Sequence, residues 1–373
     1  MNKTSIEWTH RPETGGEGFT WNPIRARNKE TGKVGTFCTH ASPGCLNCYA
    51  EAINKRFGNG LEFNVPNLEK IEFFMSQKIL EAPLRKNLPC TIFGGDMNDM
   101  FHESIPDEFI DRAVTVVALA QWHTFQFLTK RAERMMRYFQ ALTWDRICEC
   151  ANQNWEGGQH GVGAYNLCSV AHLGSKKRIA LGDWTSYQRL AKPPLPNLWL
   201  GVSCESQKYA DERIPLLLQT PAVVRFLSVE PMLESVRLDE CAPYVLNGDE
   251  SNPGILNAFT AQCHHPLTVK VAPPKTASPD GISWVICGGE SGPGARPFNL
   301  AWAESLQEQC KAAGVVFFMK QVGSRPVLGD IKFPNGDSGK LMLPTENRKG
   351  GDPAEWPEHL RVREFPAEKK VTA

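Results

Sequence analysis

Leu198-Trp-Leu-Gly-Val202 is a short apolar run that ends in the polar tail Ser203-Cys-Glu205. A helical pattern follows over residues 210–218, and a second apolar run, Val223-Val-Arg-Phe-Leu227, comes next. Strands that alternate with helices predict parallel β/α units, and buried parallel strands are nearly continuous apolar runs. This stretch therefore predicts one parallel β/α/β unit.

The same plan repeats along most of the 373-residue chain. Further strands are expected at residues 20–23, 90–93, 123–128, 282–287 and 315–319, and further helices at 107–119, 132–142 and 301–313. Seven such units predict a TIM-type (β/α) barrel, complete or partial, as one domain over residues 1–325. Two aperiodic stretches, about 143–196 and 239–280, are interpreted as loop insertions over the site, and 326–373 as a partly irregular C-terminal extension.

Each predicted strand ends in polar or charged residues, and in this fold the carboxyl ends of the strands meet at one face. We therefore expect the tails to converge on a single pocket. Taken one at a time, Gly-Gly pairs and Ser-Glu endings are also ordinary strand-to-helix turns and N-caps. The residues that this face would bring together are Gly94, Gly95, Asp96, Lys130, Ser203, Glu205, Glu230, Glu290 and Arg296.

A cluster of thiols follows the first predicted strand, in Cys38-Thr-His-Ala-Ser-Pro-Gly-Cys45-Leu-Asn-Cys48-Tyr-Ala. Thiolates are soft ligands that favour zinc, copper(I) or iron–sulfur clusters, and three of them leave a four-coordinate centre one ligand short. Free cysteine also behaves as a small buried hydrophobe, so buried thiols without metal are the alternative. The spacing favours a metal centre or cluster at Cys38, Cys45 and Cys48.

Composition narrows the class of protein. The formal net charge is zero, so the totals show no electrostatic footprint for nucleic acid or a membrane surface. No apolar run approaches the roughly 20 residues of a membrane helix. Residues 1–8 lack the apolar segment of a secretory signal. We therefore expect a cytoplasmic protein with reduced thiols and no membrane partner.

Several motifs together resemble a known family. The chain is similar to the phage-associated gp-thirty-seven/gp-sixty-eight-type family of unknown function over most of residues 5–325. The cysteine loop, with its Cys-Tyr-Ala ending, also resembles the loop of radical S-adenosylmethionine (SAM) proteins. The family motifs are Trp21–Pro23, Cys38–Ala50, Asp99–His102, Leu128–Arg131, Gly201–Ser203, Leu227–Pro231 and Gly288–Arg296.

The radical SAM resemblance implies a [4Fe–4S] cluster on Cys38, Cys45 and Cys48, with SAM on the fourth iron. It implies that Gly94, Gly95 and Asp96 contact the SAM amino group, and that Ser203 and Glu205 meet its ribose or carboxylate. The candidate catalytic residues on the substrate side would then be Lys130, Glu230, Glu290 and Arg296. The first gap between cysteines is six residues here, whereas the usual gap is three.

The implied partners are an electron donor and an unidentified substrate, with nucleic acid or a nucleotide suggested by the phage association. Aromatic residues of the insertions would stack on bases or pack the insertions down: Trp144, Trp155, Tyr165 and Trp184. The alternative function is a zinc- or other metal-binding phage accessory protein without radical chemistry. In that case His40, His102 or water would complete the ligand set. The oligomeric state is left open.

Overall fold

The computed structural model describes residues 1–152, 193–244, 254–264, 270–271, 281–332 and 337–367. Its central feature is an eight-stranded sheet in which β1 pairs antiparallel with β2 and every later pair is parallel. The strand order is β1 (Asn2–Lys3), β2 (Gly18–Trp21), β6 (Thr91–Gly94), β7 (Thr124–Thr129), β8 (Leu198–Ser203), β9 (Val224–Val229), β14 (Trp284–Gly288) and β16 (Val316–Gln321). The prediction of a mostly parallel α/β sheet is therefore confirmed.

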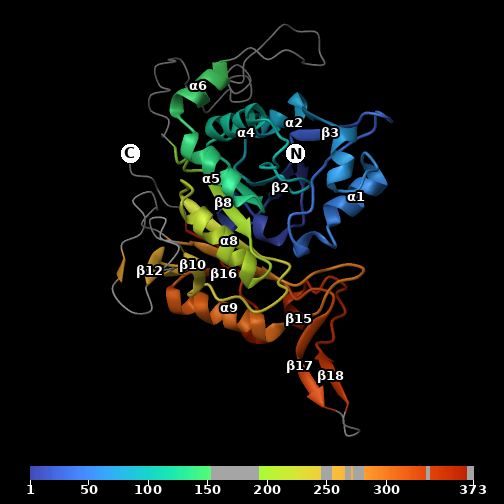
Figure 1. The fold of residues 1–373 in the computed structure, drawn as a ribbon, viewed down its shortest axis with the longest axis vertical. Coiled ribbons are helices and arrows are strands. Elements are labelled where there is room, and N and C mark those ends of the chain that lie inside the picture. Colours follow the sequence, from blue (N-terminus) through green and yellow to red (C-terminus); the bar gives the residue numbers. More distant parts are fainter. Residues whose placement is uncertain (153–192, 245–253, 265–269, 272–280, 333–336, 368–373) are drawn as a thin grey trace.

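The main helices connect the parallel strands and lie outside them (Figure 1). They are α4 (Asp107–Leu119), α5 (Ala132–Ala141), α6 (Trp144–Asn152), α8 (Gln207–Leu218) and α9 (Leu300–Ala313). Helix α4 illustrates why the spacing of apolar residues predicts these helices. Asp107 and Glu108 complement the helix dipole in the first turn, and Ile110, Val114 and Val117 bury one apolar face. The helix has the bounds that its periodicity predicts.

The inner face of the sheet is filled by aromatic side chains that gather around Trp8, in the 3-10 helix η1 (Glu7–Thr9). The Trp8 ring centroid lies 4.6 Å from Phe93 of β6 and 6.2 Å from Trp284 of β14. In a flat sheet β6 and β14 would be roughly 19 Å apart, because three strands separate them. The sheet must therefore curve around Trp8, with its outer face packed against the helices.

Within the described chain the strand pairing runs from β1 to β16 and does not close. The edge at β16 is covered by the C-terminal region instead. Met319 donates its backbone N–H to the carbonyl of Val362 at 2.8 Å, and the indole of Trp284 donates to the carbonyl of Glu364 at 3.0 Å. This region includes the 3-10 helices η6 (Pro353–Glu355) and η7 (Glu358–Leu360).

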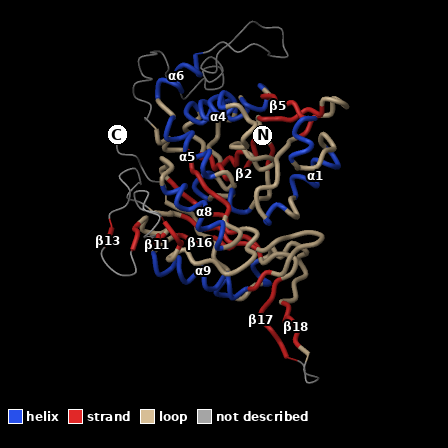
Figure 2. The backbone as a smooth tube through the Cα atoms, in the orientation of Figure 1, coloured by secondary structure: helices blue, strands red, loops and turns tan. Residues whose placement is uncertain are grey.

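Three smaller sheets lie outside the predicted plan. One contains β3 (Ile24–Asn28), β4 (Val34–Gly35) and β5 (Ile71–Met75); another contains β10 (Cys241–Tyr244), β11 (Gly254–Asn257), β12 (Gln262–His264) and β13 (Lys270–Val271); the third contains β15 (Phe298–Asn299), β17 (Pro326–Lys332) and β18 (Ser338–Met342). Figure 2 shows the β17–β18 hairpin extending away from the rest of the chain. Both the 239–280 insertion and the extension thus contain strands that their sequences did not reveal.

The remaining elements are short: η2 (Pro12–Thr14), η3 (Pro43–Cys45), α1 (Tyr49–Phe57), η4 (Val65–Lys70), α2 (Gln77–Leu80) and α3 (Ala82–Arg85). Cysteine-loop residues form η3, and α1 begins directly after Cys48. Among the described residues no helix has the length and apolar character needed to cross a membrane.

Candidate functional site

A cavity of about 540 Å³ opens at the carboxyl edge of the central sheet. Its wall includes the ends of the parallel strands, the cysteine loop, and residues Thr4 and Lys349 from distant parts of the chain. Of the residues singled out from the sequence, nine line it: Cys38, Cys45, Cys48, Gly95, Asp96, Lys130, Ser203, Glu230 and Glu290. Gly94, Glu205 and Arg296 are not among the lining residues.

The three thiols lie on one side of this cavity, and each is partly exposed. The pKa of Cys38 is raised to about 12, chiefly by burial, because the positive charge of Arg131 only partly offsets burial and the charges of Asp99, Cys45 and Cys48. Burial also raises the pKa of Cys48. Without a bound cation these two thiols are therefore protonated at neutral pH. In the described part of the chain, no three His, Cys, Asp or Glu side chains are grouped so as to hold a metal ion.

The cysteine loop is fixed at Ser42 and Gly44 by Glu205, which has no exposed surface. The Ser42 hydroxyl donates to Glu205 Oε1 at 2.7 Å, and Arg213 Nη1 donates to Oε2 at 3.0 Å. The Lys130 ammonium forms an ion pair with the same carboxylate. A Cβ at Gly44 would lie 2.5 Å from the Glu205 side chain, so only glycine allows the loop to approach so closely.

The loop is also fixed by Glu290, at Asn47 directly and at Pro43 through Arg296. Its carboxylate binds Arg296 through two guanidinium contacts, 2.7 and 3.0 Å, and accepts a hydrogen bond from Asn47 Nδ2 at 3.0 Å. Arg296 Nη1 also donates to the carbonyl of Pro43 at 2.9 Å. Burial raises the pKa of Glu290, but the bonds from Arg296 and Asn47 outweigh it and the net pKa is lowered. Arg296 therefore braces the cysteine loop from outside the cavity lining.

Two further ion pairs at the cavity each combine a lysine with a glutamate, so they add no net charge to it. The Lys320 ammonium lies 2.6 Å from Glu230 Oε1, with both side chains only 16% exposed. Lys349 lies 2.9 Å from Glu7. Sequence reasoning singled out Glu230 as a candidate catalytic residue. It gave no role to Lys320, which follows the last predicted strand, and missed Lys349, which belongs to the C-terminal extension.

The first glycine pair serves two purposes. Gly94 ends β6, and a Cβ there would lie 2.4 Å from the Phe127 ring, so this glycine permits close packing. Gly95 has φ of 82°, a conformation that favours glycine, and it turns the chain toward Asp96. The Asp96 carboxylate accepts a hydrogen bond from Asn22 Nδ2 at 2.5 Å, and burial raises its pKa. Hydrogen bonds from Asn22, its own backbone and Thr20 partly offset this rise, and Asp96 is among the residues that line the cavity.

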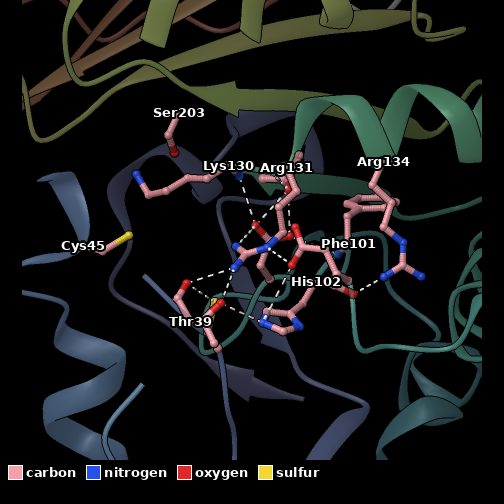
Figure 3. Close-up of polar contacts among 12 residues, drawn as sticks. Thr39, Cys45, Phe101, His102, Lys130, Arg131, Arg134 and Ser203 are labelled. Atoms are coloured by element: carbon pink, nitrogen blue, oxygen red, sulfur yellow. Dashed lines mark hydrogen bonds and ion pairs between the residues drawn. The ribbon is translucent and has the colours of Figure 1, made fainter. Parts of the chain in front are cut away.

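A largely buried network in the wall of the cavity connects two of the motifs. Asp99 accepts hydrogen bonds from the Thr129 hydroxyl at 2.7 Å, the Lys130 N–H at 3.0 Å and Arg131 Nη1 at 3.1 Å. Arg131 Nη2 donates to the carbonyl of Thr39 at 2.9 Å, beside Cys38. Figure 3 shows the Lys130 side chain extending toward Cys45 and Ser203, while Arg131 turns toward Thr39. Sequence analysis recognised both motifs but not that they meet.

The two histidines considered as metal ligands have other partners. His40 Nε2 lies 2.9 Å from Glu51 Oε2, and His102 Nε2 lies 2.9 Å from the Thr39 hydroxyl. Burial lowers the pKa of His102 to about 4, so its ring is neutral at pH 7. Among the aromatic residues of the first insertion, Trp144 packs against the main core, whereas Trp155, Tyr165 and Trp184 lie outside the described residues.

These features define a mixed α/β protein with a large, mostly parallel sheet and a thiol-lined cavity at its carboxyl edge. The chain belongs to the family described as "Protein of unknown function (DUF5131)", whose model matches residues 3–346. No curated protein and no solved structure matches the chain.

Proposed function

We propose that this protein is a radical SAM-like iron–sulfur enzyme in which Cys38, Cys45 and Cys48 hold a [4Fe–4S] cluster. The observation that carries the proposal is that three thiols from one short loop all line a single cavity, at the carboxyl edge of a curved parallel sheet. When bound and reduced, a cluster of this kind supplies one-electron cleavage of SAM to a 5′-deoxyadenosyl radical, which takes hydrogen from a substrate.

The donor set suits such a cluster in kind and number. Iron–sulfur clusters are held by cysteine thiolates, and three of them leave one iron open for a ligand. A cluster spreads its thiolates over separate irons, so they stand farther apart than the ligands of a single ion. All three thiols line the same cavity, which brings this type and number of donors to one site. Binding must release protons, because the pKa of Cys38 is about 12.

The residues of the chain then divide into two groups by their position in the cavity. Gly95, Asp96 and Ser203 lie near the thiols, and the Asp96 carboxylate is suited to accept a SAM ammonium. Lys130 lies between Cys45 and Ser203 (Figure 3), where it holds its charge beside the cysteine loop through Glu205. We assign the Glu230–Lys320 ion pair to the substrate side. There, either side chain can bind a polar group of the substrate in place of the other.

The finer fold proposal is a partial TIM-type barrel. Its support is the aromatic cluster around Trp8, which places β6 and β14 on opposite sides of one ring. An open barrel also explains why the N-terminal η1 and the C-terminal residues near Val362 occupy the gap between the edge strands.

We keep a nucleic acid or nucleotide as the proposed substrate. Supporting features are the apolar floor made by Trp8, Phe93 and Leu128, which suits a planar base, and the lysines at positions 320 and 349, which suit a phosphate. Isothermal titration with nucleotides and with single-stranded oligonucleotides tests this. A lack of heat with both classes of ligand would contradict it.

The main test is anaerobic reconstitution with iron and sulfide, followed by incubation with SAM and dithionite. We expect four irons per chain, the visible absorption of a [4Fe–4S] cluster, and release of 5′-deoxyadenosine. Cys45→Ala should lose the cluster absorption and SAM cleavage. The matched control is Cys148→Ala, which removes a partly exposed thiol on α6 and should leave both unchanged.

Metal analysis of protein purified without oxygen separates this proposal from the zinc-binding alternative. Zinc at one equivalent, with no iron and no SAM cleavage, would overturn the radical SAM proposal in favour of that alternative. Absence of any metal, with a modest loss of stability in Cys45→Ala, would show that the thiols are only buried side chains.

A further inference from the structure

Helix α1 carries an uncovered apolar stripe. Four large side chains on its outer side and in the preceding turn are exposed: Leu46 by 67%, Tyr49 by 53%, Ile53 by 43% and Phe57 by 73%. Their spacing of three or four residues puts them on one face of the helix. Single exposed apolar residues are ordinary, but a continuous row of them is characteristic of an interaction surface.

The opposite face of α1 is anchored to the protein. Ala50 and Asn54 are buried on that side, and Asn54 Nδ2 donates to Asn59 Oδ1 at 2.7 Å and to the Leu61 carbonyl at 3.0 Å. The stripe is therefore a surface presented by a fixed helix. Figure 1 places α1 at the periphery of the molecule, beside β3.

The stripe begins inside the cysteine loop. Leu46 lies between Cys45 and Cys48 in the sequence, and the Tyr49 hydroxyl donates to the carbonyl of Asp96 at 2.5 Å at the cavity wall. A partner seated on Ile53 and Phe57 would therefore reach the outer side of the thiol group without entering the cavity.

Glu51 lies in the first turn of α1, and the basic residues lie at the other end of the helix. Lys55 and Arg56 lie in the last turn of α1. Lys55 pairs with Glu62 at 2.7 Å, whereas the Arg56 guanidinium lies 4.8 Å from the Phe57 ring centroid. Arg56 has no carboxylate within 4.0 Å in the described ranges. It places an unneutralised positive charge at the end of the stripe, where it would attract a negatively charged surface.

We propose that this stripe is the docking surface for a small acidic electron-carrier protein. This inference rests on the proposed function, since it assumes that the three cysteines hold a redox centre. In the step, one electron passes from the reduced carrier to that centre. The carrier is oxidised by one electron, the centre is reduced by one, and no proton or other atom is transferred.

The test uses the double variant Ile53→Glu/Phe57→Glu, because neither side chain lines the cavity. The probe is a flavodoxin reduced by its NADPH-dependent reductase. We expect the variant to bind flavodoxin about tenfold more weakly by isothermal titration and to cleave SAM about tenfold more slowly with this donor. With dithionite, which needs no docking, its cluster content and SAM cleavage should stay within about twofold of the original protein. The matched control is Leu88→Glu/Leu341→Glu, which places the same charges on side chains exposed by 69% and 49% elsewhere, and it should bind flavodoxin normally.

The outcomes separate the two proposals. An unchanged dissociation constant for flavodoxin in the α1 variant would overturn the docking inference, whatever the activity. A dimer that the α1 variant dissociates, with flavodoxin binding unaffected, would assign the stripe to a second copy of the chain. Failure of the original protein to cleave SAM with dithionite would instead overturn the proposed function, and flavodoxin binding would still decide whether α1 is a docking surface.

Discussion

Glu205 and Glu290 both hold the cysteine loop, but their surroundings differ. Glu205 has no exposed surface and is shared by two cations, Lys130 and Arg213. Glu290 keeps a small surface at the cavity and is neutralised by Arg296, whose side chain is 26% exposed. The buried carboxylate is thus part of the framework, whereas the other carboxylate can still adjust its contacts when a ligand enters.

The largest expected difference is in stability. Glu205→Ala leaves Arg213 buried beside Lys130 without a counter-charge, so the free energy of unfolding should fall by about 3–5 kcal/mol. Glu290→Ala should cost only about 1–2 kcal/mol, because Arg296 can turn toward solvent. Urea denaturation of both variants measures the two losses. Equal losses would show that the two carboxylates do not differ as their burial suggests.

A second test concerns the close approach of the loop to Glu205. Gly44→Ala puts a methyl group against a side chain that two cations hold in place, so the loop must shift at a cost of about 1–3 kcal/mol. Reconstituted iron per chain should fall in parallel. Gly329→Ala on β17 is the control, since a Cβ there has no neighbour within 4 Å, and it should change stability by less than about 0.5 kcal/mol. If Gly44→Ala is as stable as this control, Glu205 is not a rigid support.

A third test concerns the Arg296 side of the loop. Arg296→Lys keeps the charge but loses the two-pronged contact with Glu290 and the bond to Pro43, so it should cost about 1 kcal/mol. In the reconstituted protein, a less restrained loop should release iron to a chelator several-fold faster. Arg237→Lys, on an exposed ion pair with Asp239, serves as a control that should not change this rate.

The smallest expected effect is on pH dependence. The pKa of Glu290 is lowered from 4.5 in the folded protein, so the unfolded chain binds its proton first as the pH falls. The stabilisation is therefore complete above about pH 4.5 and is lost as the pH falls through the lower folded-state value. Glu290→Gln should therefore make the free energy of unfolding depend less on pH in the acidic range below about 4.5. Identical slopes in the two proteins would contradict the assignment.

Local pattern was sufficient for much of the fold. The apolar runs located the parallel strands within a residue or two, and the periodicity of Asp107–Leu119 gave the bounds of α4. These elements are predictable because burial of a whole strand or of one helix face leaves a continuous trace in the sequence. The β17–β18 hairpin left no such trace. Its strands are mostly exposed, and their sequences mix polar residues, apolar residues and a glycine, so neither strand forms a continuous apolar run.

The candidate site was predictable in its members but not in their connections. The rule that parallel strands end at one edge brought Asp96, Lys130 and Glu290 to the same cavity. It could not show that Lys130 pairs with Glu205, or that Arg296 supports the loop, because each contact joins residues distant in sequence through side-chain geometry. Trp8 was missed for the same reason: nothing in its neighbourhood in the sequence indicates that it fills the curve of the sheet.

The wall of the cavity joins Thr4 to Lys349, and Glu7 pairs with Lys349. Thr4 and Glu7 are synthesised long before Lys349, so this part of the wall cannot form until residue 349 has been made. The cavity is therefore assembled late, after the cysteine loop has left the ribosome and while its thiols are still open to the surroundings. An inorganic centre could therefore reach the thiols before the part of the wall that contains Lys349 is in place.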